Sequence, residues 1–240
     1  MVPSENKGVR LNKYLGDSGV SSRRGADKII EEGRVTIDGM KAVLGDKVFS
    51  GNVVRVDGNV VSPEEEDIVL LFYKPRGITC TSNPEDPDNV IDYIGFSKRI
   101  YSVGRLDKES EGLLLMTNNG FLAEKIMHSS NGHDKEYIVT VDRDITEKFI
   151  KEMSRGVPIM GGSVVTRKCE IIQTGDREFR IILKQGINRQ IRRMCGELDY
   201  TALTIKRVRV LNLELGDMGV GKYRNISKSE RAELYRILDL

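Results

Sequence analysis

The sequence contains no tryptophan and little histidine or cysteine. Its two histidines, His128 and His133, leave acid–base chemistry to carboxylates, tyrosine or lysine unless one of them takes part. The three cysteines, Cys80, Cys169 and Cys195, lie far apart and include no C-x-x-C pair, which argues against a disulfide framework and a structural zinc site. We therefore expect reduced thiols and no bound metal.

Long apolar runs are also missing from the chain. No stretch approaches the roughly 18 apolar residues of a membrane-spanning helix, and Met1–Arg10 lacks the apolar segment of a secretory signal. A hydrophobic fraction of 39% is nevertheless enough to bury a core. We expect a cytoplasmic globular protein with no membrane partner, and nothing in the sequence indicates more than a monomer.

The net charge of +2 conceals two basic segments. Residues 7–28 contain six basic and two acidic residues, and residues 180–209 contain eight basic and two acidic residues. These segments carry +4 and +6, so the rest of the chain carries −8. Either segment alone could be a solvated face, but two of them favour a polyanionic partner such as a nucleic acid, because phosphate contacts need concentrated Lys and Arg.

Residues 8–61 have the pattern of a small compact unit. Apolar side chains at helical spacing predict a short helix over residues 9–15 and a second helix, capped by Ser21 or Ser22, that ends at Glu31. Short β-rich pieces separated by Asp-Gly turns follow. Because both helices carry basic outer faces, we interpret this unit as an RNA-binding module.

The rest of the chain mixes strands and helices irregularly. The acidic, proline-containing segment 62–67 is typical of a linker, so we expect domains at residues 1–62 and 63–240. Without strict strand–helix repetition, the predicted fold class is α+β rather than a doubly wound sheet. The expected strands are 68–73, 135–141, 164–172, 179–183 and 203–213, and the expected helices are 121–127, 146–154, 189–198 and 227–238.

The densest motif covers residues 103–112 and holds Arg105 and Asp107 two positions apart. In an extended segment both side chains project from the same face, and the guanidinium group favours the ionised carboxylate. Such an aspartate can serve as a nucleophile or a base, although an Arg-x-Asp pair is more often a structural ion pair. Flanking glycines and a following apolar run indicate a loop on a rigid scaffold, which favours a functional role.

A second motif, over residues 183–194, is rich in arginine. If Asn188 caps a helix, Arg189, Arg192 and Arg193 fall on one helical face. Guanidinium groups at a helix start, beside free backbone N–H groups, suit a phosphate or a buried carboxylate. A solvated charged face is the alternative, and we favour a functional role for these arginines.

A tyrosine and a basic turn complete the candidate residues. Tyr137 shares one face of the strand 135–141 with two valines, which is usually a core position. A ring that faced a site could instead stack on a base, and its hydroxyl could act as a base or a donor. Lys74 begins a basic turn over residues 74–77, which is weak evidence by itself.

Together these motifs resemble the RsuA-type pseudouridine synthases, which act on ribosomal RNA, and in particular their RluF branch. The resemblance covers nearly the whole chain. Residues 9–56 resemble the S4 RNA-binding domain, residues 104–107 the catalytic loop, residues 135–137 the tyrosine strand and residues 186–194 the basic helix. The RluF branch is indicated by residues 10–14, 156–159 and 168–169.

The resemblance implies a fold and an activity. The fold would be α+β, with a small N-terminal S4-like RNA-binding domain and a larger synthase domain that contains a mixed, mainly antiparallel sheet. The enzyme would isomerise a specific uridine to pseudouridine in folded ribosomal RNA, from the large subunit (23S) for the RluF branch, with tRNA as a further candidate substrate. The reaction breaks the bond between N1 and C1′ and rejoins the base through C5, which requires no cofactor.

The resemblance also implies residue roles. Asp107 would add to C1′ or remove the C2′ proton, Arg192 would pair with Asp107, and Tyr137 would pack on the base. Arg105 would occupy the space that the flipped uridine leaves. The expected RNA contacts come from Arg10, Lys13, Tyr14, Arg23, Arg24, Lys74, Asn188, Arg189, Gln190 and Arg193.

The chain departs from the family pattern at a few positions, and two other functions compete. Tyr73 stands where the family usually has asparagine, and Ser110 and Asn119 replace the commoner threonine and aspartate. A non-catalytic RNA-binding or ribosome-assembly protein would use both basic segments, but it leaves Asp107 unexplained because a carboxylate repels phosphate. A base-removing hydrolase would need a second positioned acid or base to activate water.

Overall fold

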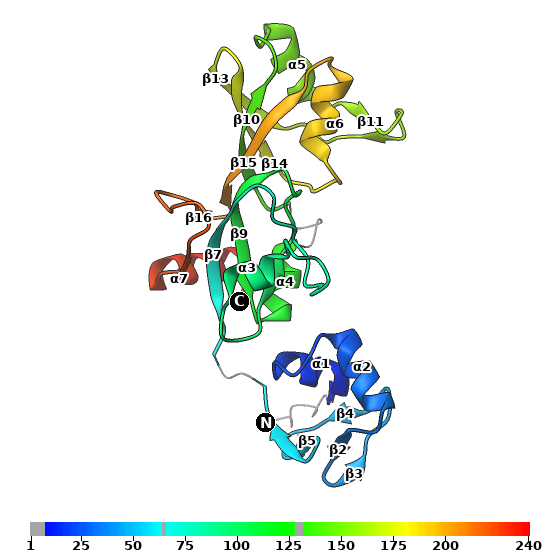
Figure 1. The fold of residues 1–240 in the computed structure, drawn as a ribbon. Helices are drawn as coiled ribbons and strands as arrows, with labels where there is room; N and C mark the ends of the chain where they lie inside the picture. The colour runs from blue at the N-terminus through cyan, green and yellow to red at the C-terminus, as the bar shows by residue number, and fades with distance from the viewer. Residues whose placement is uncertain (1–7, 64–65, 128–131) are drawn as a thin grey trace, which may run out of the picture. The chain divides into compact units, whose positions relative to one another are not determined.

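The chain forms two compact units (Figure 1). The computed structural model describes residues 8–63, 66–127 and 132–240. The first unit comprises Met1–Asp67 with Asn118–Gly120, and the second comprises Ile68–Thr117 with Phe121–Leu240. The division therefore falls at the end of the acidic segment that we interpret as a linker, and the domain boundary at residue 62 stays a prediction.

The first unit packs two helices on a small sheet. Its elements are β1 (Val9–Arg10), α1 (Leu11–Asp17), α2 (Arg23–Glu31), β2 (Val35–Ile37), β3 (Met40–Lys41), β4 (Lys47–Val48), β5 (Val54–Val56) and β6 (Asn59–Val61). The sheet order is β3-β2-β5-β6, and β1 pairs with β4. Ser22 caps α2 by accepting a 3.0 Å hydrogen bond from the Gly25 N–H. Val9 was expected in the first helix, but it pairs with Val48 as a strand residue.

The second unit is built on a mixed sheet. Its strands are β7 (Val69–Lys74), β8 (Tyr101–Val103), β9 (Glu111–Thr117), β10 (Lys135–Val141), β13 (Glu170–Gly175), β14 (Glu178–Leu183), β15 (Ala202–Val210), β16 (Leu213–Glu214) and β17 (Tyr223–Asn225). The order along the sheet is β13-β14-β10-β15-β9-β7-β17. Every recorded pairing is antiparallel except that of β9 with β15, so the sheet is mixed and mainly antiparallel, as predicted.

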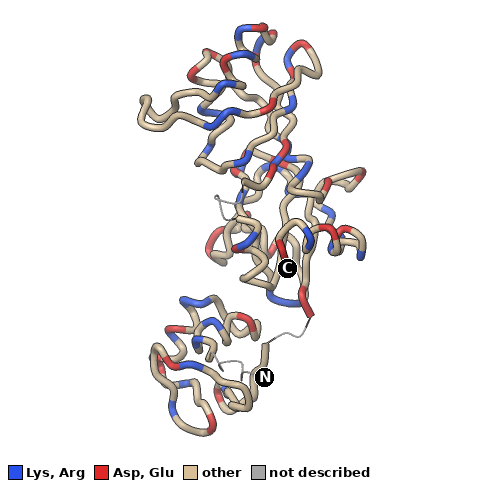
Figure 2. The backbone as a smooth tube through the Cα atoms, turned by 180° about the vertical axis from the view of Figure 1, so that it is seen from behind, with Lys and Arg blue, Asp and Glu red and all other residues tan. Residues whose placement is uncertain are grey.

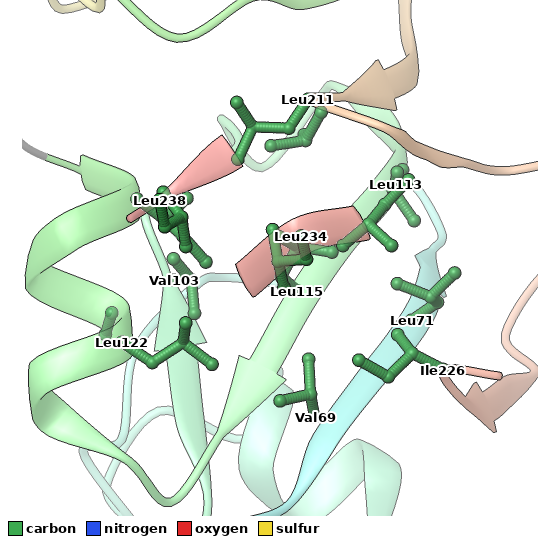
Figure 3. Close-up of a cluster of buried hydrophobic side chains, with 14 of the residues drawn as sticks. Val69, Leu71, Val103, Leu113, Leu115, Leu122, Leu211, Ile226, Leu234 and Leu238 are labelled. Carbon is green, nitrogen blue, oxygen red and sulfur yellow. The ribbon is translucent and has the colours of Figure 1, made fainter. Parts of the chain in front are cut away.

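Helices cover both halves of this sheet. They are α3 (Val90–Ile94), α4 (Gly120–Met127), α5 (Glu147–Arg155), α6 (Gln190–Glu197) and α7 (Lys228–Ile237). Leu122 of α4 and Leu234 of α7 pack with Leu71 and Leu115 on one face of β7 and β9 (Figure 3). Residues of α3 pack on the opposite face of these strands. Residues of α5 and α6 pack together with β10, β14 and β15 in a separate core.

Two predicted strands are each divided in the structure. The segment 164–172 contains β12 (Val164–Val165), which forms a hairpin with β11 (Pro158–Ile159), and then the start of β13. The division falls at Thr166, whose backbone and hydroxyl both bond Val157. The segment 203–213 divides at Leu211, where a φ of 54° turns the chain from β15 into β16.

Four short elements of the second unit were not predicted, namely α3, β8, β11 and β17. They contain between two and five residues, and their residue patterns are weak. The strand β9 forms from the apolar run that follows the Asp107 motif. Within the described ranges, none of the helices has the length and apolar character that crossing a membrane requires.

Candidate active site

A pocket of about 830 Å³ opens in the second unit, on the sheet face that α6 covers. Six segments contribute to its wall: the segment after β7, the loop between β8 and β9, the end of α4, the start of β10, the connection from β14 to α6, and β15. Asp107 is the one carboxylate among the lining residues, whereas six of them are Lys or Arg. The pocket is therefore strongly basic around a single acid, which suits an anionic ligand.

The loop that carries Asp107 is held firmly on both sides. Leu106 is buried in the core against α3 and its N–H contacts Cys80 Sγ at 3.3 Å. The carbonyl oxygen of Asp107 accepts a 3.0 Å hydrogen bond from the Ser110 N–H, which closes a tight turn before β9. The Asp107 side chain remains 27% exposed and lines the pocket.

Lys74 lies beneath this loop and not on the RNA-facing surface. Its side chain is fully buried, and its Nζ donates to the carbonyl oxygens of Pro75 and Ser110 at 2.8 Å and contacts that of Lys108 at 3.5 Å. The expectation that Lys74 contacts RNA is therefore wrong. Burial lowers the pKa of this ammonium group, and its neighbours Cys80 and Asp107 act in the opposite direction.

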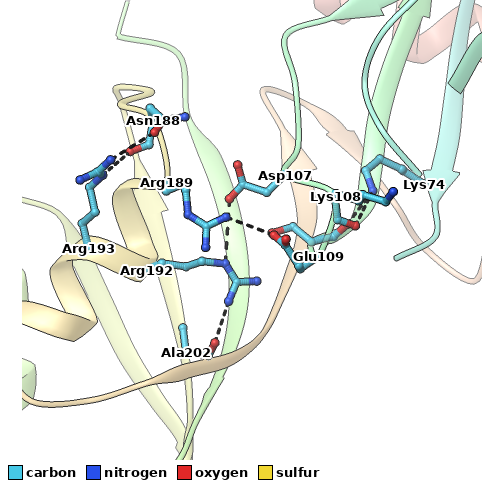
Figure 4. A network of polar contacts seen from close by, with 10 residues as sticks. Lys74, Asp107, Lys108, Glu109, Asn188, Arg189, Arg192, Arg193 and Ala202 are labelled. Carbon is cyan, nitrogen blue, oxygen red and sulfur yellow. Dashed lines mark hydrogen bonds and ion pairs between the residues drawn. The ribbon is translucent and has the colours of Figure 1, made fainter. Parts of the chain in front are cut away.

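Arg192 approaches Asp107 from α6 (Figure 4). Its Nε lies 3.9 Å from Asp107 Oδ2, and one of its terminal nitrogens donates a 2.8 Å hydrogen bond to the Ala202 carbonyl oxygen. The Nε and Nη2 atoms are buried and make no hydrogen bond within the described chain. The guanidinium group is thus anchored at one end, and its other donors face the carboxylate at ion-pair distance.

The other arginines of this motif have different partners. Arg189, not Asn188, is the N-cap of α6, with a φ of 53° and no side-chain cap bond. Arg189 instead pairs with Glu109 at 3.1 Å, which lowers the pKa of that carboxyl together with a backbone hydrogen bond within Glu109. Arg193 folds back to donate to the backbone carbonyl of Asn188 at 2.9 Å. The predicted cap at Asn188 is therefore wrong, whereas Arg189 and Arg192 both reach acids of one loop, Glu109 and Asp107.

Gln190 also differs from its expected role as an RNA contact. Only 4% of its surface is exposed, and its side-chain oxygen accepts a 3.2 Å hydrogen bond from the Ile187 N–H. It lies in the pocket wall and holds the turn that leads into α6. Its side chain therefore supports the pocket wall, and the RNA contact of Gln190 stays a prediction.

Tyr137 lies where β10 joins the two halves of the sheet. Its ring packs against the core of α5 and α6 and also against the core of α3. It lines the pocket together with Asp107 and the exposed Arg105. The structure thus brings together four residues that lie far apart in the sequence, namely Arg105, Asp107, Tyr137 and, through its ion pair, Arg192.

In the first unit, Lys and Arg positions are spread along the chain (Figure 2). Arg10, Arg23 and Arg24 are exposed, as an RNA contact requires. Lys13 is partly buried and lies 3.7 Å from Asp17. The Tyr14 hydroxyl donates a 3.2 Å hydrogen bond to the Val61 carbonyl oxygen, and burial raises its pKa.

Three residues of the pocket were missed by the sequence reasoning: Lys135, Gln185 and Arg207. Arg207 is 3% exposed and occupies an otherwise apolar row of β15 with Ile205, which is the one signal that could have identified it. Lys135 and Gln185 lie within the predicted tyrosine strand and the arginine-rich motif, but neither was a candidate site residue. In the described part of the chain, no cluster of three or more His, Cys, Asp or Glu residues is arranged to hold a metal ion.

Comparison with known proteins agrees with this geometry. The family described as RNA pseudouridylate synthase matches residues 68–197, which include Asp107, Tyr137 and Arg192, and the S4 domain matches residues 9–54. The chain belongs to this pseudouridine synthase family. It is therefore an isomerase that converts uridine to pseudouridine.

Individual synthases match over nearly the whole chain. Dual-specificity RNA pseudouridine synthase RluF of Escherichia coli strain K12 is 45% identical over 241 aligned positions, which cover 100% of this chain and 82% of that protein. Ribosomal large subunit pseudouridine synthase B of Bacillus subtilis strain 168 is 30% identical, with 96% and 97% covered. The predicted resemblance to RsuA-type synthases and their RluF branch is confirmed.

A solved structure shares the fold of this synthase. A crystal structure of pseudouridylate synthase superposes with a TM-score of 0.69 at 23% identity, covering 94% of this chain and 99% of that one. The predicted fold class, α+β with an N-terminal S4 domain and a mixed sheet, is confirmed.

Proposed function

We propose that Asp107 is the catalytic carboxylate of this pseudouridine synthase, that Arg192 orients it and that Tyr137 packs on the target base. The observation that carries the proposal is the ion pair of 3.9 Å between Asp107 and Arg192 at the edge of a pocket that Tyr137 also lines. An ionised aspartate is a competent nucleophile or base, and the Arg192 guanidinium group lies at ion-pair distance from it.

The chemistry needs only one acid and a shaped cavity. Asp107 either adds to C1′ of the ribose or removes the C2′ proton, and in both cases the N1–C1′ bond breaks and the base departs with the bonding electrons. The base then turns and forms a new bond from C5 to C1′; in the first route this bond displaces the Asp107 carboxylate from C1′, and in the second route Asp107 returns the proton to C2′. The C5 proton is lost, N1 gains a proton, and the sum is an isomerisation. The Tyr137 hydroxyl is a candidate acceptor for the C5 proton.

A uridine inside a helix cannot reach Asp107, so the target must leave its stack. The pocket of about 830 Å³ has room for a flipped nucleotide, and Arg105 lies at its rim, where it would fill the vacated space. The exposed arginines of the first unit would bind the surrounding RNA through its phosphates.

The names of the relatives support a ribosomal substrate. One relative is a ribosomal large subunit synthase, and another is a dual-specificity RNA synthase. We propose that this enzyme acts as a cytoplasmic monomer on large-subunit ribosomal RNA, with tRNA as a second substrate to be tested.

The test is the release of tritium from C5-tritiated ribosomal RNA, because the isomerisation leaves the RNA mass unchanged. Wild type should release the label, and Asp107→Asn and Asp107→Ala should not. Asp144→Asn is the matched control, since its carboxylate pairs with Arg177 on the exposed surface. Label release by the Asp107 variants at the wild-type rate would remove Asp107 from the mechanism. A wild-type protein inactive on every ribosomal RNA but able to bind it would favour the non-catalytic alternative.

A further inference from the structure

Arg207 is a buried cation in the pocket that the roles assigned above do not use. It is 3% exposed, its Nε donates a 2.7 Å hydrogen bond to the Leu113 carbonyl oxygen, and it lines the pocket. Its Nη2 is buried and has no hydrogen-bond partner in the described chain. A buried guanidinium donor without an acceptor is unfavourable, so the group is complementary to an acceptor that a ligand supplies.

The register of the sheet places Arg207 beside Tyr137. An irregularity in the pairing of β10 with β15 leaves Val208 unpaired, so Tyr137 lies opposite Arg207. Side chains directly opposite each other share one face of the sheet, with Cβ atoms about 5 Å apart. A base that packs on the Tyr137 ring therefore lies within reach of the Arg207 guanidinium group.

A close strand contact brings the Asp107 loop to the same place. Gly112 is the second residue of β9, just after that loop, and pairs with Arg207 in the parallel ladder. A Cβ atom at Gly112 would lie 2.2 Å from the Arg207 carbonyl oxygen, so only glycine permits this approach. The sheet thus holds the acid that attacks the ribose and the buried cation at a fixed separation.

A second cation, Lys135, lies near Arg207. Burial lowers the pKa of the Lys135 ammonium group, and the charge of Arg207 lowers it further. Its Nζ donates to the His133 carbonyl oxygen at 3.2 Å, and the neighbouring Asp134 pairs with Lys184 at 3.9 Å. Of the residues that line the pocket, only Asp107 is acidic, and Arg192 already faces it. This pair of cations therefore lacks a carboxylate of its own among the described lining residues.

The reaction itself generates an anion at this position. When the N1–C1′ bond breaks, its electron pair leaves with N1, and the charge of the uracil anion spreads to the O2 and O4 carbonyl oxygens. The anion lasts until C5 donates an electron pair to C1′, after which the C5 proton is lost and N1 is protonated. Preorganised donors in a buried site stabilise such developing charge strongly.

We propose that Arg207, with Lys135 beside it, binds a carbonyl oxygen of the target uracil and stabilises the anion of the base while it is detached from the ribose. This proposal rests on the function proposed above. It adds a role for Arg207 at the base, which is separate from the role of Asp107 at the ribose. A uracil carbonyl accepts the Arg207 donor at both stages, but the interaction is stronger in the anion, so it accelerates bond cleavage.

The test compares two leaving groups in the full-length enzyme. RNA substrates carry uridine or 5-fluorouridine at the target position, and the fluorine withdraws electrons, so the detached base is a more stable anion. Single-turnover loss of the original target nucleoside is followed by nuclease digestion and chromatography, because 5-fluorouridine has no C5 proton to lose and its reaction stops after C5 has joined C1′. Arg207→Met should slow conversion of uridine on the order of 10²-fold and conversion of 5-fluorouridine much less, with RNA affinity unchanged. Arg207→Lys should restore part of the uridine rate.

Lys206→Met is the matched control. Lys206 precedes Arg207 on β15 and projects from the other face, where its Nζ lies over the Tyr73 ring at 5.2 Å. It should retain the wild-type rate on both substrates. If Arg207→Met does not fold, as judged by circular dichroism, Lys135→Met carries the same comparison and should show a smaller loss that again shrinks with 5-fluorouridine.

Two results would overturn the inference. An equal loss with both bases would make Arg207 a structural residue, and weaker RNA binding with a lower salt dependence would make it a phosphate contact. Both results presuppose an active wild type and an inactive Asp107→Asn. An inactive wild type or an active Asp107→Asn would instead contradict the proposed function. That outcome is therefore distinguishable from a failure of the inference about Arg207.

Discussion

The ammonium group of Lys74 donates a 2.8 Å hydrogen bond to the carbonyl oxygen of Ser110. This contact links the end of β7 to the turn that starts at Asp107, and a second bond of 2.8 Å to Pro75 fixes the ammonium group itself. A fully buried lysine is costly unless its donors are used, so Lys74 is retained here as the support of the loop that carries the acid.

Lys74→Met should therefore reduce activity more than RNA binding. Methionine fills the same volume but leaves the carbonyl oxygens of the loop without donors, which costs about 1–3 kcal/mol of unfolding free energy. We expect single-turnover tritium release to fall by about tenfold or more, since small misplacements of catalytic groups are expensive. Lys148→Met, on the exposed surface of α5, is the control for this substitution and should match wild type. A Lys74→Met enzyme with full activity would show that the loop needs no such support.

Gly112→Ala tests the parallel contact between β9 and β15. The added Cβ would lie 2.2 Å from the backbone of Arg207 at a φ of 104°, so both the contact and the conformation are unfavourable. Urea unfolding should show that the free energy of unfolding falls by several kcal/mol, or that the variant does not fold. Gly104→Ala is the comparison, because Gly104 also has a positive φ of 76° but open space around it. Its free energy of unfolding should fall by only about 1 kcal/mol. Equal losses would mean that backbone strain, and not the strand contact, requires glycine.

The N-terminus of α7 should make stability depend on pH. Hydrogen bonds from Arg224 and from the backbone of Ser227 hold the pKa of Glu230 at about 2, below its ordinary 4.5. The Glu230 pKa is lower in the folded protein than in the unfolded chain, so ionisation of Glu230 stabilises the fold at pH values above 4.5. This contribution is lost as the pH falls from 4.5 towards 2.

Because the Arg224 side chain is 43% exposed, solvent screening limits the contribution to about 1 kcal/mol. Urea titrations of wild type and Glu230→Gln should therefore differ at pH 7 and converge near pH 2–3. Glu152→Gln, which removes an exposed pair with Lys148 on α5, should track wild type throughout. A constant gap between wild type and Glu230→Gln across this range would exclude ionisation as the cause.

Removal of residues 1–61 should weaken RNA binding and its salt dependence. The missing segment carries exposed arginines, including Arg23 and Arg24, and each lost phosphate contact lowers the salt slope. The remaining residues form a unit with cores of its own and should still unfold cooperatively. The double variant Arg23→Ala and Arg24→Ala should reproduce part of the loss in the intact chain. Unchanged affinity after truncation would place the main RNA contacts in the second unit.

Local patterns in the sequence were sufficient for most helices and strands. The capping box that begins with Ser227 and the alternation in residues 135–141 depend on neighbours in the chain, and the structure contains both elements as predicted. Predictions of long strands were wrong where a turn depends on tertiary contacts. At Thr166, for example, hydrogen bonds to Val157 end the strand. The predicted cap of α6 was wrong for the same reason, because Arg189, the N-cap residue in the structure, pairs with Glu109 of another segment.

By itself, the sequence determined the two-part organisation, the fold class, the family and the candidates Asp107, Tyr137 and Arg192, because motifs and periodicity are properties of neighbouring residues. Only the tertiary structure decided which polar side chains face the pocket. Lys74 and Arg207 are both basic strand residues, yet one lies beneath the Asp107 loop and the other in the pocket wall. That difference depends on strand pairing and on one unpaired residue in β15, and long-range register leaves no local trace in a chain.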